Sequence, residues 1–475
     1  MAPYATWATA ATNIQDAVDA AKAGDTVLVT NGVYVTGARE AFDTYTNPLG
    51  LSRVVITNAI RLLSASGSLV TTIRGLQLGN EVGTVTNGIR CVFLGSNAVL
   101  SGFTLTNGYA GLGGGVGCES TTAVVSNCVL TGNQAGDGAG AFGGTLDNCS
   151  LTGNWAYYGG GALSSALNNC KLSGNWALRG GAVEFGTLYN CTLTDNSAGP
   201  GGGACRATLY NCTLTGNSAN SGGGAYECTL NNCTLTGNSA DDGGGGASYG
   251  TLNNCILYSN AAPNGPNYCD SQWGPIALNF CCTTPLPTSG VGNITNSPLF
   301  VDYASGNLRL QGTSPCINAG KNAYITNSTD LDGSARVVSG TVDIGAYEFQ
   351  GEGSLISYAW LQQYGLPTDG SADYLDSDSD GHNNWQEWRC LTDPTNTLSA
   401  LRMLSARPSG TNVTVAWQSV VGVNYFLERS ADLGVASVFT PLATNILGQT
   451  GTTSYTDTNL TGAGPFFYRV GVNSR

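Results

Sequence analysis

Apolar and polar positions alternate in a short pattern that recurs through the middle of the chain, from about residue 100 to residue 260. The pattern reads T-L-x-N-C-T-L-T-G-N-x-A and leads into a glycine cluster, with its clearest copies at 187–198, 208–219 and 229–240. Cysteine and leucine stand two positions apart, so they share one face of a strand while the threonines take the other. Glycine and asparagine then end the strand. The pattern predicts very short strands, each with one apolar face.

The cysteines give the period of this repeat. Six are spaced 21 residues apart and a seventh follows after 22: Cys128, Cys149, Cys170, Cys191, Cys212, Cys233 and Cys255. Strands this short cannot bury a face alone, so we expect the coils to stack into a parallel β-helix, each strand pairing with its neighbours above and below. Leucine and cysteine would then line the interior, with Phe103 at the cysteine position of a degenerate copy.

The corners of the coils carry asparagine and glycine. We expect a hydrogen-bonded ladder from the asparagines that end successive strands: Asn133, Asn154, Asn175, Asn196, Asn217, Asn238 and Asn260. Glycine clusters such as 159–161 and 201–203 predict tight bends where a Cβ atom would clash. The cysteines are interpreted as small buried hydrophobes, because their spacing does not match a zinc site. The redox state of the adjacent pair Cys281 and Cys282 stays open.

The two ends of the repeat region resemble known β-helix proteins. Residues 12–34 read as an Asn-capped amphipathic helix, a Gly-Asp turn and a strand, which resembles the cap of the pectate-lyase-like β-helix superfamily. SPLFVDYASGNLRLQGTSPCINAG (297–320) and VDIGAYEFQ (342–350) resemble the closing coils of bacterial surface proteins of the choice-of-anchor type. The resemblance implies a right-handed helix and export. The expected segments are a cap at 1–54 and a β-helix at 55–350.

An acidic segment at 351–397 holds the strongest site signal. Its sequence DSDSDGHNNWQE (376–387) matches the twelve-residue EF-hand loop, which binds Ca²⁺. The motif assigns six ligands by position: side-chain oxygens of Asp376, Asp378 and Asp380, the backbone carbonyl of His382, Asn384, and both carboxylate oxygens of Glu387. The alternative interpretation is a solvated acidic linker without a metal.

The residues around this loop resemble dockerin-like or thrombospondin-type-3-like calcium segments of secreted bacterial proteins. That resemblance adds Asp393, in the trailing T-D-P, as a secondary ligand.

The tail at 398–475 has alternating runs at 412–417, 424–429 and 465–472, which predict a small antiparallel β-sandwich. It resembles a fibronectin-type-III module, with Trp417 in its core. The predicted fold class is therefore all-β: a capped β-helix, a calcium-binding linker and a β-sandwich.

The net charge of the chain limits the classes of partner that it can bind. The formal net charge is −13 and only 10% of residues are charged, which excludes nucleic acid and anionic membranes as expected partners. No run of 18 apolar residues is long enough for a membrane span. The first residues lack the basic and apolar regions of a signal peptide, and we interpret this as a leader already removed. The expected location is extracellular or at the cell surface.

Catalytic residues are scarce in the repeat region. Four charged side chains are candidates because neighbouring coils could bring them together: Arg179, Glu184, Arg206 and Glu227. The pair Asp241–Asp242 lies in a variable glycine corner, and the single histidine, His382, leaves the superfamily's catalytic Gly-His-Gly pattern absent. We therefore expect a structural, adhesive or glycan-binding protein, with polysaccharide, cell-surface or matrix components, or other copies of itself, as partners. A polysaccharide lyase or glycoside hydrolase is the alternative.

Two outward columns of hydroxyl side chains suggest a minor alternative. One runs Thr131, Thr152, Ser173, Thr194, Thr215 and Thr236; the other runs Val129, Ser150, Lys171, Thr192, Thr213 and Thr234. Flat threonine arrays can bind ice, but Lys171 interrupts this one and threonine is a common exposed strand residue.

Overall fold

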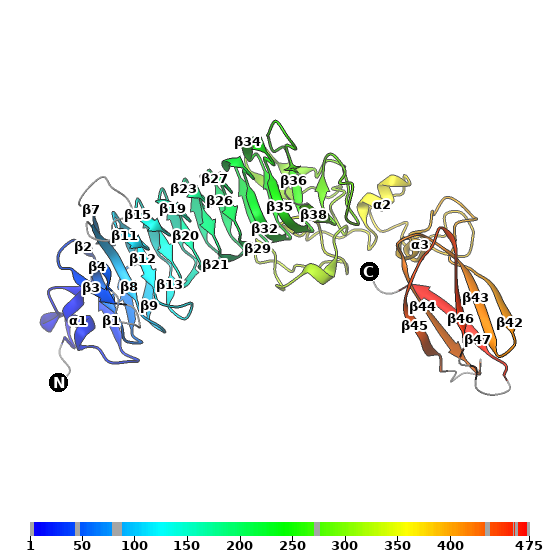
Figure 1. Ribbon diagram of the computed structural model, residues 1–475, viewed down its shortest axis with the longest axis horizontal. Coiled ribbons are helices and arrows are strands. Elements are labelled where there is room, and N and C mark those ends of the chain that lie inside the picture. The colour runs from blue at the N-terminus through cyan, green and yellow to red at the C-terminus, as the bar shows by residue number, and fades with distance from the viewer. Residues whose placement is uncertain are drawn as a thin grey trace. The chain divides into compact units, whose positions relative to one another are not determined.

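The computed structural model of the protein describes residues 4–42, 48–77, 88–269, 276–432, 438–458, 460 and 464–472. The chain forms two compact units. The first comprises Met1–Gln311, Ala323–Val337 and Asp343–Phe349, and the second comprises Gly312–Asn322, Val338–Val342 and Gln350–Arg475. Strands dominate both units (Figure 1). Across the described ranges, no helix is long and apolar enough to cross a membrane.

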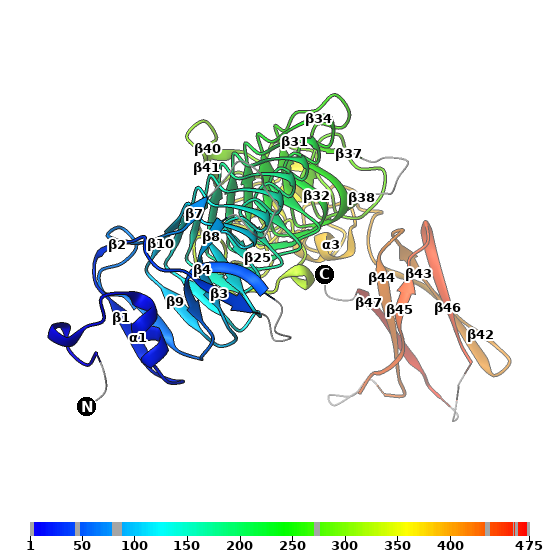
Figure 2. The ribbon, with the colours of Figure 1, turned by 60° about the vertical axis from the view of Figure 1, so that its left-hand side comes forward.

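The first unit is a parallel β-helix, as the repeat predicts, and its coils stack one behind another (Figure 2). Three sheets run along the stack. The first sheet has 21 strands among the described residues. They are β1 (Thr26–Val29), β3 (Arg39–Phe42), β4 (Pro48–Ile56), β5 (Arg61–Ser64), β7 (Leu76–Gln77), β8 (Gly88–Leu94), β9 (Val99–Ser101), β12 (Val116–Cys118), β13 (Val124–Ser126), β16 (Ala141–Phe142), β17 (Thr145–Asp147), β20 (Ala162–Leu163), β21 (Ala166–Asn168), β24 (Val183–Glu184), β25 (Thr187–Tyr189), β28 (Ala204–Cys205), β29 (Thr208–Tyr210), β32 (Ala225–Asn231), β35 (Ala247–Asn253), β37 (Tyr268–Cys269) and β38 (Ile276–Asn279).

The second and third sheets each take one strand from a coil. The second sheet contains, in order, β2 (Gly32–Tyr34), β6 (Thr71–Arg74), β10 (Thr104–Thr106), β14 (Val129–Thr131), β18 (Ser150–Thr152), β22 (Lys171–Ser173), β26 (Thr192–Thr194), β30 (Thr213–Thr215), β33 (Thr234–Thr236), β36 (Ile256–Tyr258) and β39 (Cys282–Thr283). The third contains β11 (Tyr109–Leu112), β15 (Gln134–Asp137), β19 (Trp155–Tyr158), β23 (Trp176–Arg179), β27 (Ser197–Pro200), β31 (Ser218–Ser221) and β34 (Ser239–Gly243).

The register of the sheets follows the 21-residue period. Leu130 pairs with Leu151 and Leu193 pairs with Leu214, so equivalent residues of successive coils stack directly. The leucine column and the cysteine column are buried in one continuous core, and Phe103 occupies the first cysteine position as predicted. The inner cysteines from Cys128 to Cys255 are free thiols. This arrangement confirms that they act as small core residues.

Cys281 lies near the end of this core, whereas Cys282 pairs in register with Ile256 in the outward column of the second sheet. Both are buried free thiols that donate hydrogen bonds to backbone carbonyls, Cys281 Sγ to Leu252 O at 3.4 Å and Cys282 Sγ to Asn296 O at 3.1 Å. Neither of the two thiols forms a disulfide in this structure.

Two asparagine ladders satisfy the polar corners of the coils. In the predicted inner ladder, from Asn133 to Asn260, each Nδ2 donates to the next Oδ1 at 2.9–3.0 Å. A second ladder was not predicted. It uses the asparagine before each repeat cysteine, where the backbone adopts a φ of 51–54°, as in the bond of 2.7 Å from Asn148 Nδ2 to Asn127 Oδ1. The ladder is interrupted at Asn169, whose Nδ2 donates to Asp147 Oδ1, and at Asn232, whose Nδ2 donates to Tyr324 O. Asparagine tolerates this left-handed conformation better than most residues.

The glycine clusters allow the coils to approach one another closely, as predicted. A Cβ atom added to Gly161 would lie 2.6 Å from the carbonyl oxygen of Ala182, and one on Gly203 would lie 2.5 Å from that of Gly224.

At the N-terminal end, α1 (Ile14–Ala20) follows the short η1 (Trp7–Thr9), and Asn13 Oδ1 accepts the cap hydrogen bond from Asp16 N at 2.8 Å. The predicted helical cap is therefore present.

The segment after residue 297, where closing coils were expected, instead folds back over the second sheet. It contains an antiparallel pair, β40 (Phe300–Asp302) and β41 (Asn307–Leu310), and then irregular chain that includes η2 (Asn322–Tyr324). Ala346 N donates to Thr234 Oγ1 at 3.0 Å, and Thr236 Oγ1 donates to the Tyr303 hydroxyl at 3.3 Å. Both threonines are buried as a result. The outward hydroxyl columns are thus not an open array along their full length.

The second unit combines two short helices with antiparallel strands. The helices are α2 (Tyr358–Gln363) and α3 (Asn384–Cys390). One sheet contains β42 (Met403–Ser409), β43 (Asn412–Ser419) and β46 (Gly451–Asp457), and the other contains β45 (Thr440–Leu447), β44 (Asn424–Ser430) and β47 (Phe467–Val472). Trp417 is 0% exposed and packs against Tyr425, with ring centroids 5.9 Å apart. This confirms its predicted place in the core of the tail.

Candidate calcium site

The loop at 376–387 is shaped by its first aspartate. Asp376 Oδ1 accepts hydrogen bonds from Ser379 N at 2.8 Å and Asp380 N at 3.1 Å, and its Oδ2 accepts from Gly381 N at 2.9 Å. Gly381 has a φ of +97°, a backbone conformation that would be strained for any residue with a side chain. The Asp376 carboxylate therefore holds the loop in a curve around its own oxygens, and the glycine of the motif makes the sharp turn.

This wrapping gathers three carboxylates at one point. One oxygen from each of Asp376, Asp378 and Asp380 lies within 4.8 Å of the others, which is close enough for all three to touch a single cation. Like charges this close repel one another in a protein environment. The cluster is therefore costly unless a cation or protons neutralise it.

Glu387 adds a fourth carboxylate from α3 and is only 1% exposed. The helix starts at a capping box formed by Asn383 and Gln386, which fixes the helix end next to the loop. Burial, together with the nearby charges of Asp378 and Asp380, raises the pKa of Glu387 to about 7. Thr392 Oγ1 donates to Glu387 Oε1 at 3.3 Å, so one oxygen of this carboxylate is already held in place.

Several of these oxygens lack the partners that buried polar atoms require. Among the described residues, the buried oxygens Asp378 Oδ2, Asp380 Oδ2 and Glu387 Oε2 accept no hydrogen bond. The guanidinium of Arg402 lies 3.5 Å from Asp380 Oδ2 and balances only part of the charge. A hard cation that takes oxygen ligands fits this donor set. Asp376 is exposed, as a solvated acidic linker would have it, whereas Glu387 and the Asp380 side chain are buried.

The remaining predicted ligands have mixed positions. His382 N donates to Asp380 Oδ1 at 2.8 Å, which places its backbone within the loop. The Asn384 side chain is buried and its Nδ2 donates to Ala372 O at 2.8 Å, while its Oδ1 accepts no hydrogen bond. Asp393 Oδ1 accepts from Thr395 N and Oγ1 at 3.0 and 2.7 Å, so this carboxylate closes its own turn.

Two supporting residues were not predicted from the sequence. Asp373 is buried and accepts a hydrogen bond from Leu355 N at 2.8 Å, which ties the start of the loop segment to the chain before α2. Arg402 Nη2 donates to Asp380 O at 3.4 Å and to Thr397 O at 2.9 Å, and thereby joins the loop to the start of the sandwich. The only signal for Asp373 was its place three residues before the motif.

A second cluster of charges lies on the β-helix and contains the four catalytic candidates. Arg179 ends β23, and its Nη2 lies 2.9 Å from Oε1 of Glu184 in β24. Arg206 and Glu227 occupy equivalent positions of successive coils and pair at 2.6 Å between Nε and Oε2. Burial raises the pKa of Glu184, although the charges of Arg179 and Arg206 act against this rise. The stacking of coils therefore does bring these side chains together.

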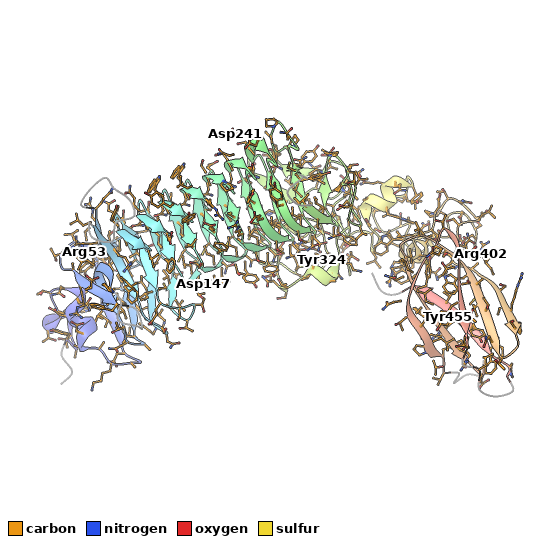
Figure 3. All side chains as sticks on the ribbon, viewed as in Figure 1. Arg53, Asp147, Asp241, Tyr324, Arg402 and Tyr455 are labelled. Atoms are coloured by element: carbon orange, nitrogen blue, oxygen red, sulfur yellow. The ribbon has the colours of Figure 1, made fainter. Side chains whose placement is uncertain are left out.

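The pairing decides what this cluster can do chemically. Hydrogen bonding to Glu227 raises the pKa of Arg206, so its guanidinium holds its proton more tightly than a free one. An arginine in that state is a poor general base. The other acidic pair, Asp241 and Asp242, is exposed in β34, and Asp241 lies on the outer edge of the stack (Figure 3). Neither arrangement shows two opposed carboxylates of the kind that glycoside hydrolysis requires.

Comparison with known proteins leaves the family of this chain open. No known protein family matches the sequence, and no curated protein matches it. A solved structure described as the crystal structure of pectate lyase Pel9A is 14% identical, with a TM-score of 0.44. The match covers 72% of this chain and 92% of that chain. The parallel β-helix itself rests on the strand pairing described above.

Proposed function

We propose that this protein is an extracellular or cell-surface β-helix with a structural or adhesive role that includes polysaccharide binding, and that Ca²⁺ stabilises its second unit. The observation that carries the proposal is the group of buried carboxylate oxygens of Asp378, Asp380 and Glu387 that accept no hydrogen bond. Crowded carboxylates without partners destabilise the fold unless a cation compensates them. Binding of a cation by this loop would offset that cost in stability.

Calcium at this loop would fix a junction inside the second unit. Asp376, Asp378, Asp380 and Glu387 would supply the ligands, with the His382 carbonyl as a further one. Glu387 belongs to α3, and Arg402 joins Asp380 to the start of the sandwich. Bound calcium would therefore hold the helix, the loop and the first sandwich strand in one arrangement. Extracellular modules commonly bind calcium with dissociation constants of about 10⁻⁴–10⁻³ M, within reach of extracellular calcium.

Isothermal titration calorimetry with calcium tests the site. We expect one binding event that Asp376→Ala abolishes, because this carboxylate both shapes the loop and offers a ligand. Asp369→Ala is the matched control: Asp369 is an exposed acid of the same segment whose carboxylate accepts hydrogen bonds from Ser371. Absence of binding in the wild-type protein, or equal binding by Asp376→Ala, would contradict the assignment.

A polysaccharide lyase or glycoside hydrolase is the second candidate function. The convergence of Glu184 with Arg179 and Arg206 supports it, whereas the ion pairs of both arginines count against a general base among them. Screening against acidic and neutral polysaccharides, with detection of unsaturated products and new reducing ends, distinguishes the two functions. Turnover that is lost in Arg179→Ala would favour the enzyme.

A further inference from the structure

The third sheet departs from repetition at two adjacent strands, β19 and β23. Their inward positions keep the small residue of the repeat, Ala156 and Ala177, both fully buried. Their outward positions instead carry large side chains: Trp155, Tyr157 and Tyr158 in β19, and Trp176, Leu178 and Arg179 in β23. The strands on either side, β15 and β27, hold Gln-Gly-Asp and Ser-Gly-Pro at these outward positions. The departure is therefore local, and the fold does not require it.

These side chains form a ledge of aromatic rings, which we call the tryptophan ledge and define by Trp155, Tyr157, Tyr158 and Trp176. Trp155 pairs in register with Trp176, and their rings stack with centroids 5.2 Å apart and planes within 5° of parallel. Trp155 also contacts Tyr157, with centroids 5.7 Å apart. Trp176 is 37% exposed and Tyr158 is 42% exposed. Large rings are costly to leave in water, so a cluster of them on one face indicates a surface that binds something.

A fixed cation borders the ledge. Arg179 Cζ lies 5.7 Å from the centroid of the Tyr158 ring, and its Nη2 pairs with Glu184 Oε1 at 2.9 Å. Glu184 is 1% exposed, and Arg179 is the cation in direct contact with its carboxylate, while the charge of Arg206 also favours the ionised form. The Arg179 side chain is still partly exposed. The ledge thus has donor N–H groups beside aromatic faces, on a guanidinium whose charge is already balanced.

We propose that the tryptophan ledge binds a chain of neutral sugars. This inference rests on the proposed polysaccharide-binding role and names its site and ligand class. Pyranose rings carry C–H groups on one face that pack on aromatic rings, and hydroxyl groups at their edges that accept hydrogen bonds from a guanidinium. A uronate chain would need an unbalanced cation, and Arg179 is neutralised by Glu184. The charge of the site therefore favours neutral over acidic polysaccharide.

Affinity electrophoresis in gels that contain a soluble polysaccharide tests the ledge. The probes are mixed-linkage β-glucan, xyloglucan and galactomannan as neutral chains, and polygalacturonate as the acidic chain. We expect at least one neutral chain to retard the wild-type protein, and the double variant Trp155→Ala/Trp176→Ala to bind it roughly tenfold more weakly or worse. Polygalacturonate should not retard the protein.

The chain offers a matched control on another face. Tyr189 and Tyr210, in β25 and β29 of the first sheet, also stack in register, with centroids 4.8 Å apart and planes within 7° of parallel. Tyr189→Ala/Tyr210→Ala removes an equivalent ring pair and should leave retardation within about twofold. Trp176→Phe keeps a ring at the ledge and should retain most binding, which separates loss of the ring from loss of the fold. Circular dichroism checks that each variant is folded.

The outcomes separate this inference from the proposed function. Retardation that survives in Trp155→Ala/Trp176→Ala overturns the ledge while leaving a polysaccharide-binding protein. Retardation by polygalacturonate alone overturns the choice of a neutral ligand. No retardation by any neutral chain overturns the ledge, whereas the calcium site stands or falls by calorimetry. Loss of retardation in the tyrosine control together with the tryptophan variant also overturns it.

Discussion

The coils of the β-helix and the acidic loop of the second unit treat buried polar groups in opposite ways. In the coils, each inner asparagine gives its amide to the next and receives the same from the coil before, so the polar corners are satisfied by repetition. In the loop, carboxylates face one another and several buried oxygens have no partner. The comparison teaches that repetition satisfies the polar groups of the coils within the chain, whereas the proposed calcium ion would satisfy those of the loop from outside it.

The largest expected effect comes from breaking the repeat itself. Leu193 is fully buried and pairs in register with Leu172 and Leu214, so Leu193→Ala would leave a cavity that the stacked coils cannot close. We expect it to lower the free energy of unfolding of the first unit by about 3 kcal/mol. Hydrogen–deuterium exchange followed by mass spectrometry reports the change in the peptides of each unit separately.

Thr192→Ala is the control for this prediction, because Thr192 lies beside Leu193 on the outward face of the same strand. Its effect should stay within about 0.5 kcal/mol. Faster exchange in the second unit after Leu193→Ala would contradict the independence of the two regions. Equal effects of the two substitutions would contradict the division of inner and outer columns.

Calcium removal is expected to destabilise the acidic loop of the second unit and to leave the coils unchanged. If the loop binds calcium, saturation at about 100 times the dissociation constant stabilises the second unit by about 2.7 kcal/mol, and a chelator removes that amount. Exchange should then accelerate around α3 and the first sandwich strand, while the coils stay unchanged because their polar groups are satisfied internally. A chelator effect confined to the coils, or equal in Asp376→Ala and wild type, would show that the loop is not the site.

The coils were predictable because equivalent residues meet equivalent residues. The cysteine and leucine columns, the inner asparagine ladder and the cap at Asn13 all follow from spacing and from strand alternation. The loop was predictable for a different reason: its side chains gather through backbone hydrogen bonds within a few residues of Asp376. Both kinds of contact are encoded locally or periodically.

The contacts that were missed join residues with no periodic relation. Thr234 meets Ala346 across more than 100 residues, and the burial of the outward threonines depends on that return of the chain. The second asparagine ladder was visible as the asparagine before each cysteine, but its role depends on a left-handed backbone that the pattern did not reveal. The tryptophan ledge was not predicted, because Trp155 and Trp176 stand at the variable position of the G-N-x-A pattern, where the repeat sets no residue type. In a solenoid, departures from the repeat hold most of the information about binding.

The smallest expected effect concerns the charged side chains on the surface of the coils. Arg206 and Glu227 form an ion pair whose side chains are both 38% exposed, and exposed pairs contribute little to stability. Arg206→Gln should therefore change the free energy of unfolding by about 0.5 kcal/mol or less, and should leave polysaccharide retardation unchanged because the residue lies outside the tryptophan ledge. Glu227→Gln provides the matched change on the other partner. If Arg206→Gln instead abolishes turnover of a polysaccharide while stability is unaffected, the coils contain an active site, and the departure from repetition at this position is catalytic rather than structural.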